Sequence, residues 1–437
     1  MSFGAWGTGA RPVFTPPLGV TSARFNFPST YTEVSAGRAT EARFADLDFV
    51  SDWNPIDGLG FGGNAVGSTG AVSFMFSNVD FSGYGNPFVH NDRIVNGERF
   101  QTPGFNYHFD NMVLTNYQSY AIITGDQLEA RTTFTGCSLA QNPLAPQALP
   151  NRQGGDGLHQ GFARELYIAG CDFFHNMGHG GGSYGNNPFT WASNRLADSA
   201  VDDGAKINIH TTSFEGGAEG INFATRHATH TKIANGLIHN CVVVGDHTTA
   251  YSVAIGYAGF TVRNNLMIMP DTPLRSPLNP GRAFVQIAPR SGSSHTDTDP
   301  MRDAPNKVYS NTFVGLRSKE DNQNLGYLGV RDNQQVPGSV HENNILYRPN
   351  QDGGDVDGPL DATTLLPWSP RNQGWRNGDT GQLDTSYAFQ AAELAVYLPS
   401  DGSAALGSAT GVFARDDLRG VVRAVGSADR GAFQVTP

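Results

Sequence analysis

The feature that most constrains this chain is a seven-residue pattern that recurs ten times between residues 43 and 345. Its copies read RFADLDF, MFSNVDF, HFDNMVL, TFTGCSL, YIAGCDF, NIHTTSF, KIANGLI, TVRNNLM, KVYSNTF and SVHENNI. The second and seventh positions are apolar in every copy. The fourth position favours residues that tolerate a left-handed backbone, and its occupants are Asp46, Asn78, Asn111, Gly136, Gly170, Thr211, Asn235, Asn264, Ser310 and Glu342.

Each copy therefore predicts a strand, a tight bend and a second strand. Successive copies lie 24 to 46 residues apart, so a constant wall alternates with loops of variable length. A strand that stacks on its equivalent in the next repeat permits such loops, because they project sideways without disturbing the ladder. We therefore predict an all-β chain that forms a right-handed parallel β-helix, a solenoid of about ten coils with irregular loops.

A further strand is expected in each coil, from stretches such as YAIITG, DGLHQG, EGINFAT, YSVAIGYA, RAFVQIAP and GYLGVRD. Stretches without a counterpart in neighbouring coils are expected to be loops, namely 141–155, 175–200, 270–281, 291–305 and 318–324. The repeat dissolves after residue 350, so we expect the β-helix in residues 1–350. Residues 351–437 are expected to form an irregular C-terminal segment and a cap that covers the open end of the sheet.

Stacked repeats should also align side chains inside the solenoid. We expect an asparagine ladder of Asn265, Asn311 and Asn343. Cys137 and Cys171 fall in one column and are expected to be buried free thiols, since in-register stacking rarely offers disulfide geometry. Cys241 is interpreted as isolated.

Composition excludes some classes of function. The chain has 29 Lys and Arg against 40 Asp and Glu, a net charge of −11, which argues against a nucleic-acid partner. No apolar run is long enough to span a membrane. The P-loop and zinc-type Cys and His spacing do not occur. The bare strings of the dinucleotide fingerprint (58–63) and of the Gly-x-Ser-x-Gly elbow (181–185) occur without the strand-to-helix context that these motifs require.

Over residues 40 to 350 the repeat pattern resembles the pectate-lyase-like superfamily of right-handed β-helices. That resemblance implies a polysaccharide partner and an enzyme or a glycan-binding protein. The opening GAWGTGARPVF and the closing stretch from Asp401 to Gln434 resemble phrases of secreted β-helix proteins. They imply a secreted or cell-surface protein, in which residues preceding Met1 are expected.

An acid, a Gly and an apolar residue open two of the second strands, at Asp156 and at Glu219. The coil between them offers Asp203 or, five residues earlier, Asp198 in the same place. One interpretation is an ordinary corner. The other is an acidic column that binds a hard cation such as Ca²⁺, with candidate ligands Asp156, Asp202, Asp203 and Glu219.

Eight of the twelve His lie between residues 156 and 247, beside the Gly-rich loop NMGHGGGSYGNNPF. This concentration favours a binding site there. The candidate substrate-binding residues are His159, His179, Asn222 and Trp191.

Three mechanisms fit these residues. A uronate lyase needs a base, a group that neutralises the carboxylate, and an acid for the leaving oxygen. The stretch from AKIN to FATRHATHTKIANGLI is similar to β-helical alginate lyases, in which a Lys and an Arg-His pair lie about one coil apart. That similarity implies Lys206 as base, provided its pKa is lowered, Arg226 as neutralising or donating group, and His227 and Tyr184 in support. The glutamates that precede the Lys in those enzymes are missing.

The second mechanism is glycoside hydrolysis by paired carboxylates, with Asp202 and Asp203 and either Asp156 or Asp198 as candidates. Adjacent strand residues point to opposite faces, so both could enter one cleft only within a bend. The third is a non-enzymatic tailspike or adhesin that binds glycans through aromatic residues such as Tyr107, Tyr167, Tyr184 and Trp191. A lyase is expected to be a monomer and a tailspike a trimer.

Overall fold

In a computed structural model of the 437-residue chain, every described element is a β-strand. The structure describes residues 1–5, 9–15, 25–27, 40–51, 62–68, 72–90, 94–95, 98–99, 106–117, 121–124, 131–141, 158–160, 162–174, 193–197, 200–215, 219–223, 234–245, 251–256, 259–269, 283–287, 304–316, 328–332, 337–348, 373–376, 383–384 and 397–435. Over these residues no helix is long and apolar enough to cross a membrane.

The strands pair in three parallel ladders, which we name by their order along the chain. The first ladder contains β1 (Ser2–Gly4), the opening halves of β4 (Thr40–Val50) and β6 (Val72–Ser82), β10 (Asn106–Asp110), β13 (Arg131–Thr135), β16 (Phe162–Ala169), β19 (Ala200–His210), β22 (Ala234–His239), β25 (Phe260–Arg263), β28 (Lys307–Tyr309) and β31 (Val340–Glu342).

The second ladder contains β2 (Val13–Phe14), the closing halves of β4 and β6, β11 (Val113–Tyr117), β14 (Ser138–Gln141), β17 (Asp172–Phe174), β20 (Ser213–Glu215), β23 (Val242–Val244), β26 (Leu266–Met269), β29 (Thr312–Gly315), β32 (Ile345–Arg348) and β33 (Gln373–Arg376).

The third ladder is a separate sheet of β3 (Phe25–Phe27), β5 (Gly62–Ser68), β7 (Tyr84–His90), β12 (Ile122–Thr124), β15 (Leu158–Gln160), β18 (Ser193–Ala197), β21 (Glu219–Phe223), β24 (Tyr251–Ile255), β27 (Ala283–Ile287) and β30 (Leu328–Asp332). Two antiparallel pairs lie outside the ladders: β8 (Ile94–Val95) with β9 (Glu98–Arg99), and β34 (Leu383–Asp384) with β35 (Leu398–Pro399). The prediction of an all-β chain with a large parallel sheet is confirmed.

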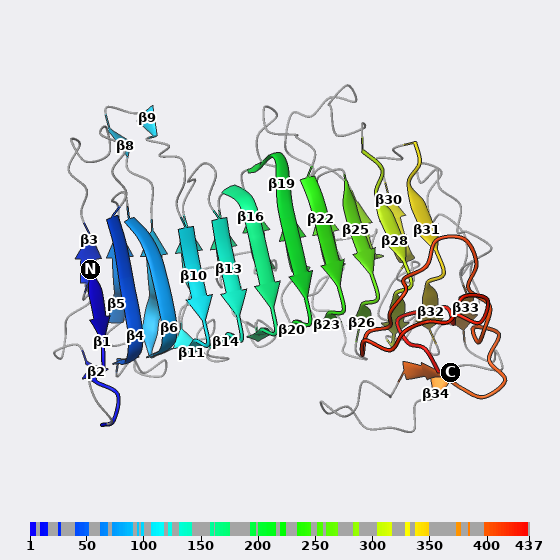
Figure 1. Cartoon of the computed structure of the whole chain (residues 1–437), viewed down its shortest axis with the longest axis horizontal. Helices are drawn as coiled ribbons and strands as arrows, with labels where there is room; N and C mark the ends of the chain where they lie inside the picture. Colours follow the sequence, from blue (N-terminus) through cyan, green and yellow to red (C-terminus); the bar gives the residue numbers. More distant parts are fainter. Residues whose placement is uncertain are drawn as a thin grey trace, which may run out of the picture.

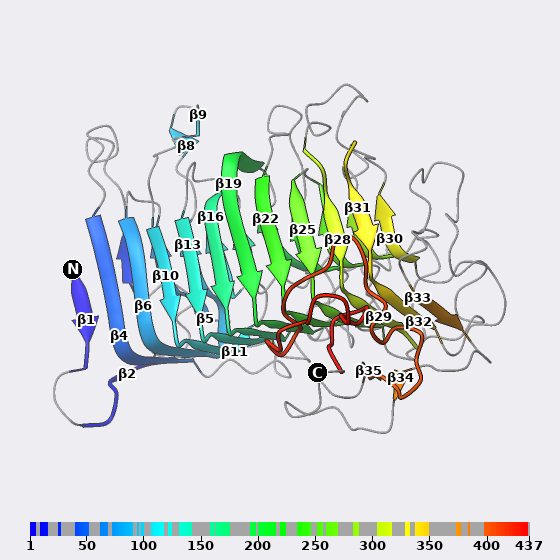
Figure 2. The same ribbon diagram turned by 45° about the vertical axis from the view of Figure 1, so that its right-hand side comes forward.

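One strand from each ladder, in chain order, forms a repeat, and the repeats stand side by side along the long axis of the molecule (Figures 1 and 2). Equivalent interior side chains meet between repeats, as the sequence predicts. Phe109 pairs in register with Phe134, and Phe134 with Ile168, and all three are buried. The two Phe rings stack with centroids 4.5 Å apart. This interior column supplies apolar burial in the repeats from Phe44 to Val308.

A left-handed residue turns the chain from the first ladder into the second. Positive φ angles near 50–60° occur at eight of the ten predicted positions: Asp46, Asn78, Asn111, Gly136, Gly170, Thr211, Asn264 and Ser310. The predicted corners at Asn235 and Glu342 are wrong, because the left-handed residues of these two repeats are Asn240 and Asn343. Ile238 occupies the first interior column, not the second, and pairs with Ile209.

The prediction of a corner at Glu342, one residue before the true corner Asn343, failed for a physical reason. The interior position there holds His341, which pairs in register with Val308 and lies 3.4 Å from the buried Asp332 carboxylate. A search for apolar residues therefore selects Val340 and Ile345, one position too early. Leu346 is the true second interior residue, since it pairs with Phe313.

From Cys137 onward, the residue after the corner has a buried amide that needs a partner. The side chain of the equivalent residue in the next repeat accepts it: Cys171 Sγ accepts from the Cys137 amide (3.4 Å) and Asn265 Oδ1 from the Cys241 amide (3.0 Å). The Asn265 and Asn311 amides donate in turn to the Oδ1 atoms of Asn311 and Asn344, each at 3.0 Å. This column of side chains thus accepts hydrogen bonds from buried backbone amides that have no partner in the strand pairing.

The same column corrects two expectations. The asparagine ladder consists of Asn265, Asn311 and Asn344, because Asn343 is the corner residue. Cys241 is not isolated but occupies the place of Cys137 and Cys171, and all three are buried free thiols. Burial raises the pKa of Cys241 to about 12, so this sulfur stays protonated at neutral pH.

The third ladder confirms the six additional strands that the sequence predicts, and it adds β3, β5, β7 and β18. β18 lies inside the stretch 175–200, which was expected to be a loop throughout, and pairs with β15 and β21. The sequence did not predict this strand because it is short and follows a Gly-rich stretch, and pairing with the neighbouring strands stabilises it.

The outward face of the second ladder changes character along the molecule. In β26, β29 and β32 every residue is buried, on both faces. The C-terminal residues cover the outer face, where one apolar cluster joins Leu266, Ile268, Val314, Ile345 and Tyr347 to Tyr397, Ala405, Leu418, Ala432 and Phe433. The segment 397–435 is therefore packed along the side of the ladders, where Figures 1 and 2 draw it in orange and red across the strands.

Corner side chains bind this segment. Asn240 Nδ2 donates to the carbonyls of Asp417 (2.7 Å) and Leu418 (3.1 Å). Three repeats further on, Asn343 Nδ2 donates to the carbonyls of Thr410 and Val412, both at 2.7 Å. The left-handed corner thus has a second use, because it presents an amide outward to the C-terminal backbone.

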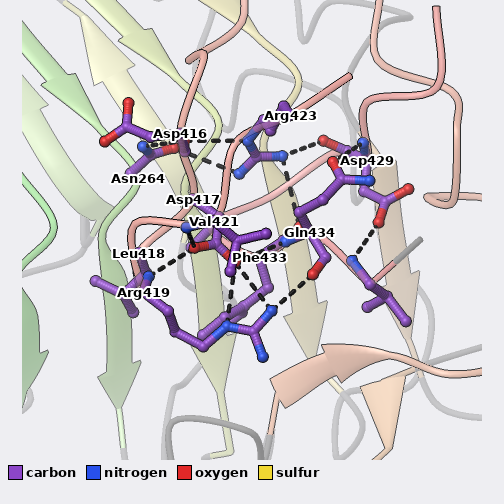
Figure 3. Close-up of polar contacts among 12 residues, drawn as sticks. Asn264, Asp416, Asp417, Leu418, Arg419, Val421, Arg423, Asp429, Phe433 and Gln434 are labelled. Atoms are coloured by element: carbon purple, nitrogen blue, oxygen red, sulfur yellow. Dashed lines mark hydrogen bonds and ion pairs between the residues drawn. The ribbon is translucent and has the colours of Figure 1, made fainter. Parts of the chain in front are cut away.

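Two buried charges hold the C-terminal segment in shape (Figure 3). Asp417 accepts hydrogen bonds from the amides of Arg419, Val421 and Gln434 and an ion pair from the Arg419 guanidinium. Arg423 donates to the carbonyls of Asp416, Asp429 and Gly431. Burial lowers the pKa of Arg423 to about 10, so the guanidinium remains charged at neutral pH.

We expect Asn311→Ala to lower the free energy of unfolding by about 3 kcal/mol. The substitution leaves the buried Asn265 amide without its acceptor and removes the hydrogen bonds that Asn311 Nδ2 donates to the Val262 carbonyl and to Asn344 Oδ1. A buried group left unsatisfied costs roughly 1–3 kcal/mol. Urea denaturation measures the change. The exposed Asn235→Ala is the control; equal stability of the two variants would contradict the role of the column.

Asp417→Ala should cost about 3 kcal/mol or more, because it removes the anion that pairs with Arg419 and leaves three amides unsatisfied. Thermal unfolding and hydrogen exchange at the Asn240 and Asn343 side chains are the measurements. The exposed Asp401→Ala is the matched control. A variant as stable as this control would show that the segment does not depend on the Asp417 network.

Candidate functional site

The outward face of the first ladder has polar residues at most positions of three neighbouring strands. In β16 and β19 the register aligns Glu165 with Lys206, Tyr167 with Asn208, and Ala169 with His210. The next strand, β22, adds Asn235, Leu237 and His239 in the same three columns. These nine positions form a grid of neighbouring residues on one face, which we call the β16–β22 face.

Tyr167 and two histidines form the described centre of this face. Tyr167 Oη lies 2.9 Å from His210 Nε2, and the two rings meet edge to face with centroids 5.3 Å apart. The His210 ring stacks on His239 at 5.1 Å. Tyr167 is 38% exposed, so this chain of rings is open to a ligand on its outer side.

His239 is joined to the C-terminal segment through the next residue. His239 Nδ1 lies 2.8 Å from Asn240 Oδ1, while Asn240 Nδ2 donates to two carbonyls. The Asn240 oxygen can therefore only accept, which fixes the proton of His239 on Nδ1. His239 is thus at the boundary between the open β16–β22 face and the repeats that the C-terminal segment accompanies.

The electrostatics favour neutral rings at this boundary. Burial lowers the pKa of His210. Burial lowers the pKa of His239 as well; the hydrogen bond to Asn240 opposes this, while Arg263 and His210 add to it. Two neutral imidazoles in contact can accept or pass on protons near neutral pH.

Lys206 lies in β19, in register between Glu165 and Asn235. Its side chain is outside the described part of the structure. Glu165 pairs with Arg131 across the neighbouring strand, with Nε and Oε2 3.8 Å apart. The candidate base Lys206 therefore occupies a position beside an acidic residue, Glu165, whose other neighbour in register is a basic residue, Arg131.

A second group of predicted residues comes together in the third ladder. His159 pairs in register with Arg195, and Arg195 with Asn222. The two predicted substrate-binding positions thus flank an arginine position that the sequence did not indicate. It was missed because the strand of this coil was sought at Asp198 or Asp203, and both registers are wrong.

The predicted cation ligands do not form one column. Glu219 lies in the third ladder, paired with Ser193. Asp202 and Asp203 lie in β19, within the four residues that separate the partners of Ala163 and Glu165. Among the described residues, no group of three or more His, Cys, Asp or Glu could hold a metal.

Several predicted residues lie outside the described residues: Tyr184, Arg226, His227, His179, Trp191 and Asp156. The stretch that contains Arg226 and His227 follows β21 and ends at Ala234, which pairs with Ala205 next to Lys206. Tyr107, proposed above as a glycan-binding aromatic, is wrong in that role, because it is fully buried and its hydroxyl lies 2.7 Å from His90 Nδ1.

Sequence reasoning also missed Tyr167 and His210 as a pair. They lie 43 residues apart, and only the register of the repeats would have joined them.

A scan of the chain against protein-family models and a search of curated protein sequences each found no match.

We expect stability to fall as the pH drops below about 6.5, the ordinary pKa of histidine. Burial holds the folded pKa of His239 below that value, so the unfolded chain binds more protons in this range and is favoured by acid. His239→Asn, which retains an amide in place of Nδ1, should weaken this pH dependence of the thermal midpoint between pH 7 and pH 5. The exposed His108→Asn is the control; identical slopes in the two variants would contradict the assignment.

Proposed function

We propose that the three ladders form a right-handed parallel β-helix of about ten coils, whose C-terminal segment accompanies its later repeats. The matching strand order of the ladders and the interior columns support this. The resemblance to pectate-lyase-like proteins then favours a secreted or cell-surface protein with a polysaccharide partner. The oligomeric state that goes with this proposal is a monomer.

We infer that the chain cleaves an acidic, uronate-containing polysaccharide by β-elimination on the β16–β22 face. The observation that carries this inference is the register, which aligns Lys206 with Glu165 on the same face as Tyr167 and His210. Neutral proton-transfer groups, charged groups and an exposed aromatic ring lie there on neighbouring strands. These are the parts that an elimination beside a carboxylate requires.

In the proposed reaction, Lys206 takes the proton from the carbon beside the carboxylate. The electrons of that bond form a double bond as the glycosidic oxygen leaves with its own pair. Arg226 neutralises the carboxylate, with His227 and Tyr184 in support. His159, Asn222, His179 and Trp191 are the proposed contacts to neighbouring sugars.

No step is assigned to Ca²⁺. Glu219 pairs in the third ladder whereas Asp202 and Asp203 lie in β19, so these three positions do not share the one column that the cation hypothesis requires. The proposed chemistry is carried by side chains of the chain alone.

Glycoside hydrolysis is the second candidate, and the backbone of β19 favours it in one respect. Asp202 and Asp203 lie where four residues of β19 face a single residue of β16. Strand alternation therefore does not force the two carboxylates to opposite faces at this irregularity. A hydrolase releases reducing ends without unsaturated sugars, so the absorbance of the product separates the two reactions.

We expect Lys206→Ala to lower kcat for cleavage of uronate polymers by at least about a hundredfold, the usual contribution of a general base. The thermal midpoint should not change. Ultraviolet absorbance of the unsaturated product measures the rate. Lys307→Ala, an exposed lysine of the same ladder, should retain wild-type activity. Full activity of Lys206→Ala would remove Lys206 from the mechanism.

A further inference from the structure

We propose that Tyr167 is the general acid of this site, positioned by His210, and that it protonates the leaving oxygen of a cleaved acidic sugar chain. This inference rests on the proposed function. The base, the neutralising group and the acid are distinct requirements of the elimination, and the acid is the one that the described side chains supply.

The geometry gives Tyr167 a single arrangement that suits an acid. His210 Nδ1 lies 3.1 Å from Thr211 Oγ1 and Nε2 lies 2.9 Å from Tyr167 Oη. With the Thr211 hydroxyl donating to Nδ1, a neutral His210 carries its proton on Nε2 and donates it to the tyrosine oxygen. The hydroxyl hydrogen of Tyr167 then points away from His210, free for a ligand.

The backbone at Thr211 supports a selected arrangement. Thr211 is a corner residue with φ of +49°, a conformation that is uncommon for a β-branched residue. The equivalent residues of the two preceding repeats are Gly136 and Gly170. Strained backbone is typical of functional sites, and here it places a hydroxyl group beside His210.

The surroundings of the pair add a further sign of a ligand. Asn208 pairs in register with Tyr167 and lies between the positions of Lys206 and His210. Its Oδ1 is buried and has no hydrogen-bond partner within the described residues. The charged and titratable groups around the pair include Glu165 and Lys206, at neighbouring positions of the same face. They also include His239, which stacks on His210, and Arg263 and Asp416 beyond it.

The position of Tyr167 relative to Lys206 suits a single glycosidic linkage. The two residues lie on adjacent strands and differ by two positions in register. Strand spacing of about 4.8 Å and a rise of about 3.3 Å per residue put their Cα atoms roughly 8 Å apart. A base and an acid held at this separation can act on neighbouring atoms of one sugar chain.

The proposed step moves one proton to Lys206 and one from Tyr167. Lys206 removes the proton beside the carboxylate, and that electron pair forms the carbon–carbon double bond. The bond to the glycosidic oxygen breaks, and this oxygen takes the hydroxyl proton of Tyr167. The resulting phenolate is stabilised by the Nε2–H of His210 and regains a proton from water.

The test compares steady-state cleavage of uronate polymers by wild type and four variants. Tyr167→Phe should lower kcat by at least about a hundredfold and change KM by less than a few fold, with an unchanged thermal midpoint. Tyr309→Phe, a tyrosine of the same ladder, is the matched control and should behave as wild type. His210→Ala should reduce kcat and shift its pH profile, and His210→Gln, whose amide can still donate, should recover part of the rate.

Thr211→Gly separates a positioning role from a structural one. Glycine relieves the left-handed strain, so the thermal midpoint should stay or rise while kcat falls. A fall in both would assign Thr211 to stability alone and overturn its role here. If wild type forms unsaturated products and Tyr167→Phe does so at a similar rate, this proposal is wrong while the lyase function stands. If wild type forms none from any uronate polymer, the proposed function itself is wrong.

Discussion

The structure depends on the corner between the first and second ladders, where a left-handed residue is followed by a buried amide. The turn is too tight for strand pairing to satisfy that amide. A side chain of the next repeat accepts it instead, as Asn311 does for Asn265 and Asn344 for Asn311. From Cys137 to Asn344 each repeat therefore completes the hydrogen bonding of the one before it. In the first repeats the same place holds the apolar Leu47, Val79 and Met112, which are buried.

The corner also explains how the C-terminal segment is attached and where it is attached. Asn240 and Asn343 offer outward amides to its backbone, whereas Gly136 and Gly170 offer none at the same position in earlier repeats. The outer residues of the second ladder change with it, from Asp172 and Ser213 to Leu266 and Ile345. The segment thus packs along the later repeats and, through Asn240, reaches the boundary of the β16–β22 face.

Much of the fold could be predicted from the sequence because the constraint repeats. Apolar columns and left-handed residues identified the corner in eight repeats, and the stack of Phe109, Phe134 and Ile168 followed from them. The exceptions are the repeats that satisfy the rule differently. His341 fills an interior position with a polar ring beside Asp332, and Ile238 fits either apolar column. In these two repeats the apolar pattern therefore predicts the corner at the wrong residue.

The candidate site was less predictable, since it depends on register between segments that sequence spacing does not fix. His159 and Asn222 were placed in one column, yet Arg195 between them was hidden by a strand that follows a Gly-rich stretch. Tyr167 and His210 belong to repeats whose separation along the chain has no period. Residues able to take part in chemistry could be identified from the sequence. Which of them are neighbours could be identified only from the register of the paired strands.

The central claim is that an acidic sugar chain binds across β16 and β19 on the outward face of the first ladder. The most direct measurement is a crystal structure of an inactive Lys206→Ala variant soaked with a uronate oligosaccharide. The account predicts ordered sugar over β16 and β19, with a glycosidic oxygen within hydrogen-bond distance of Tyr167 Oη. Sugar bound only on the second or third ladder, with none over β16 and β19, would contradict it.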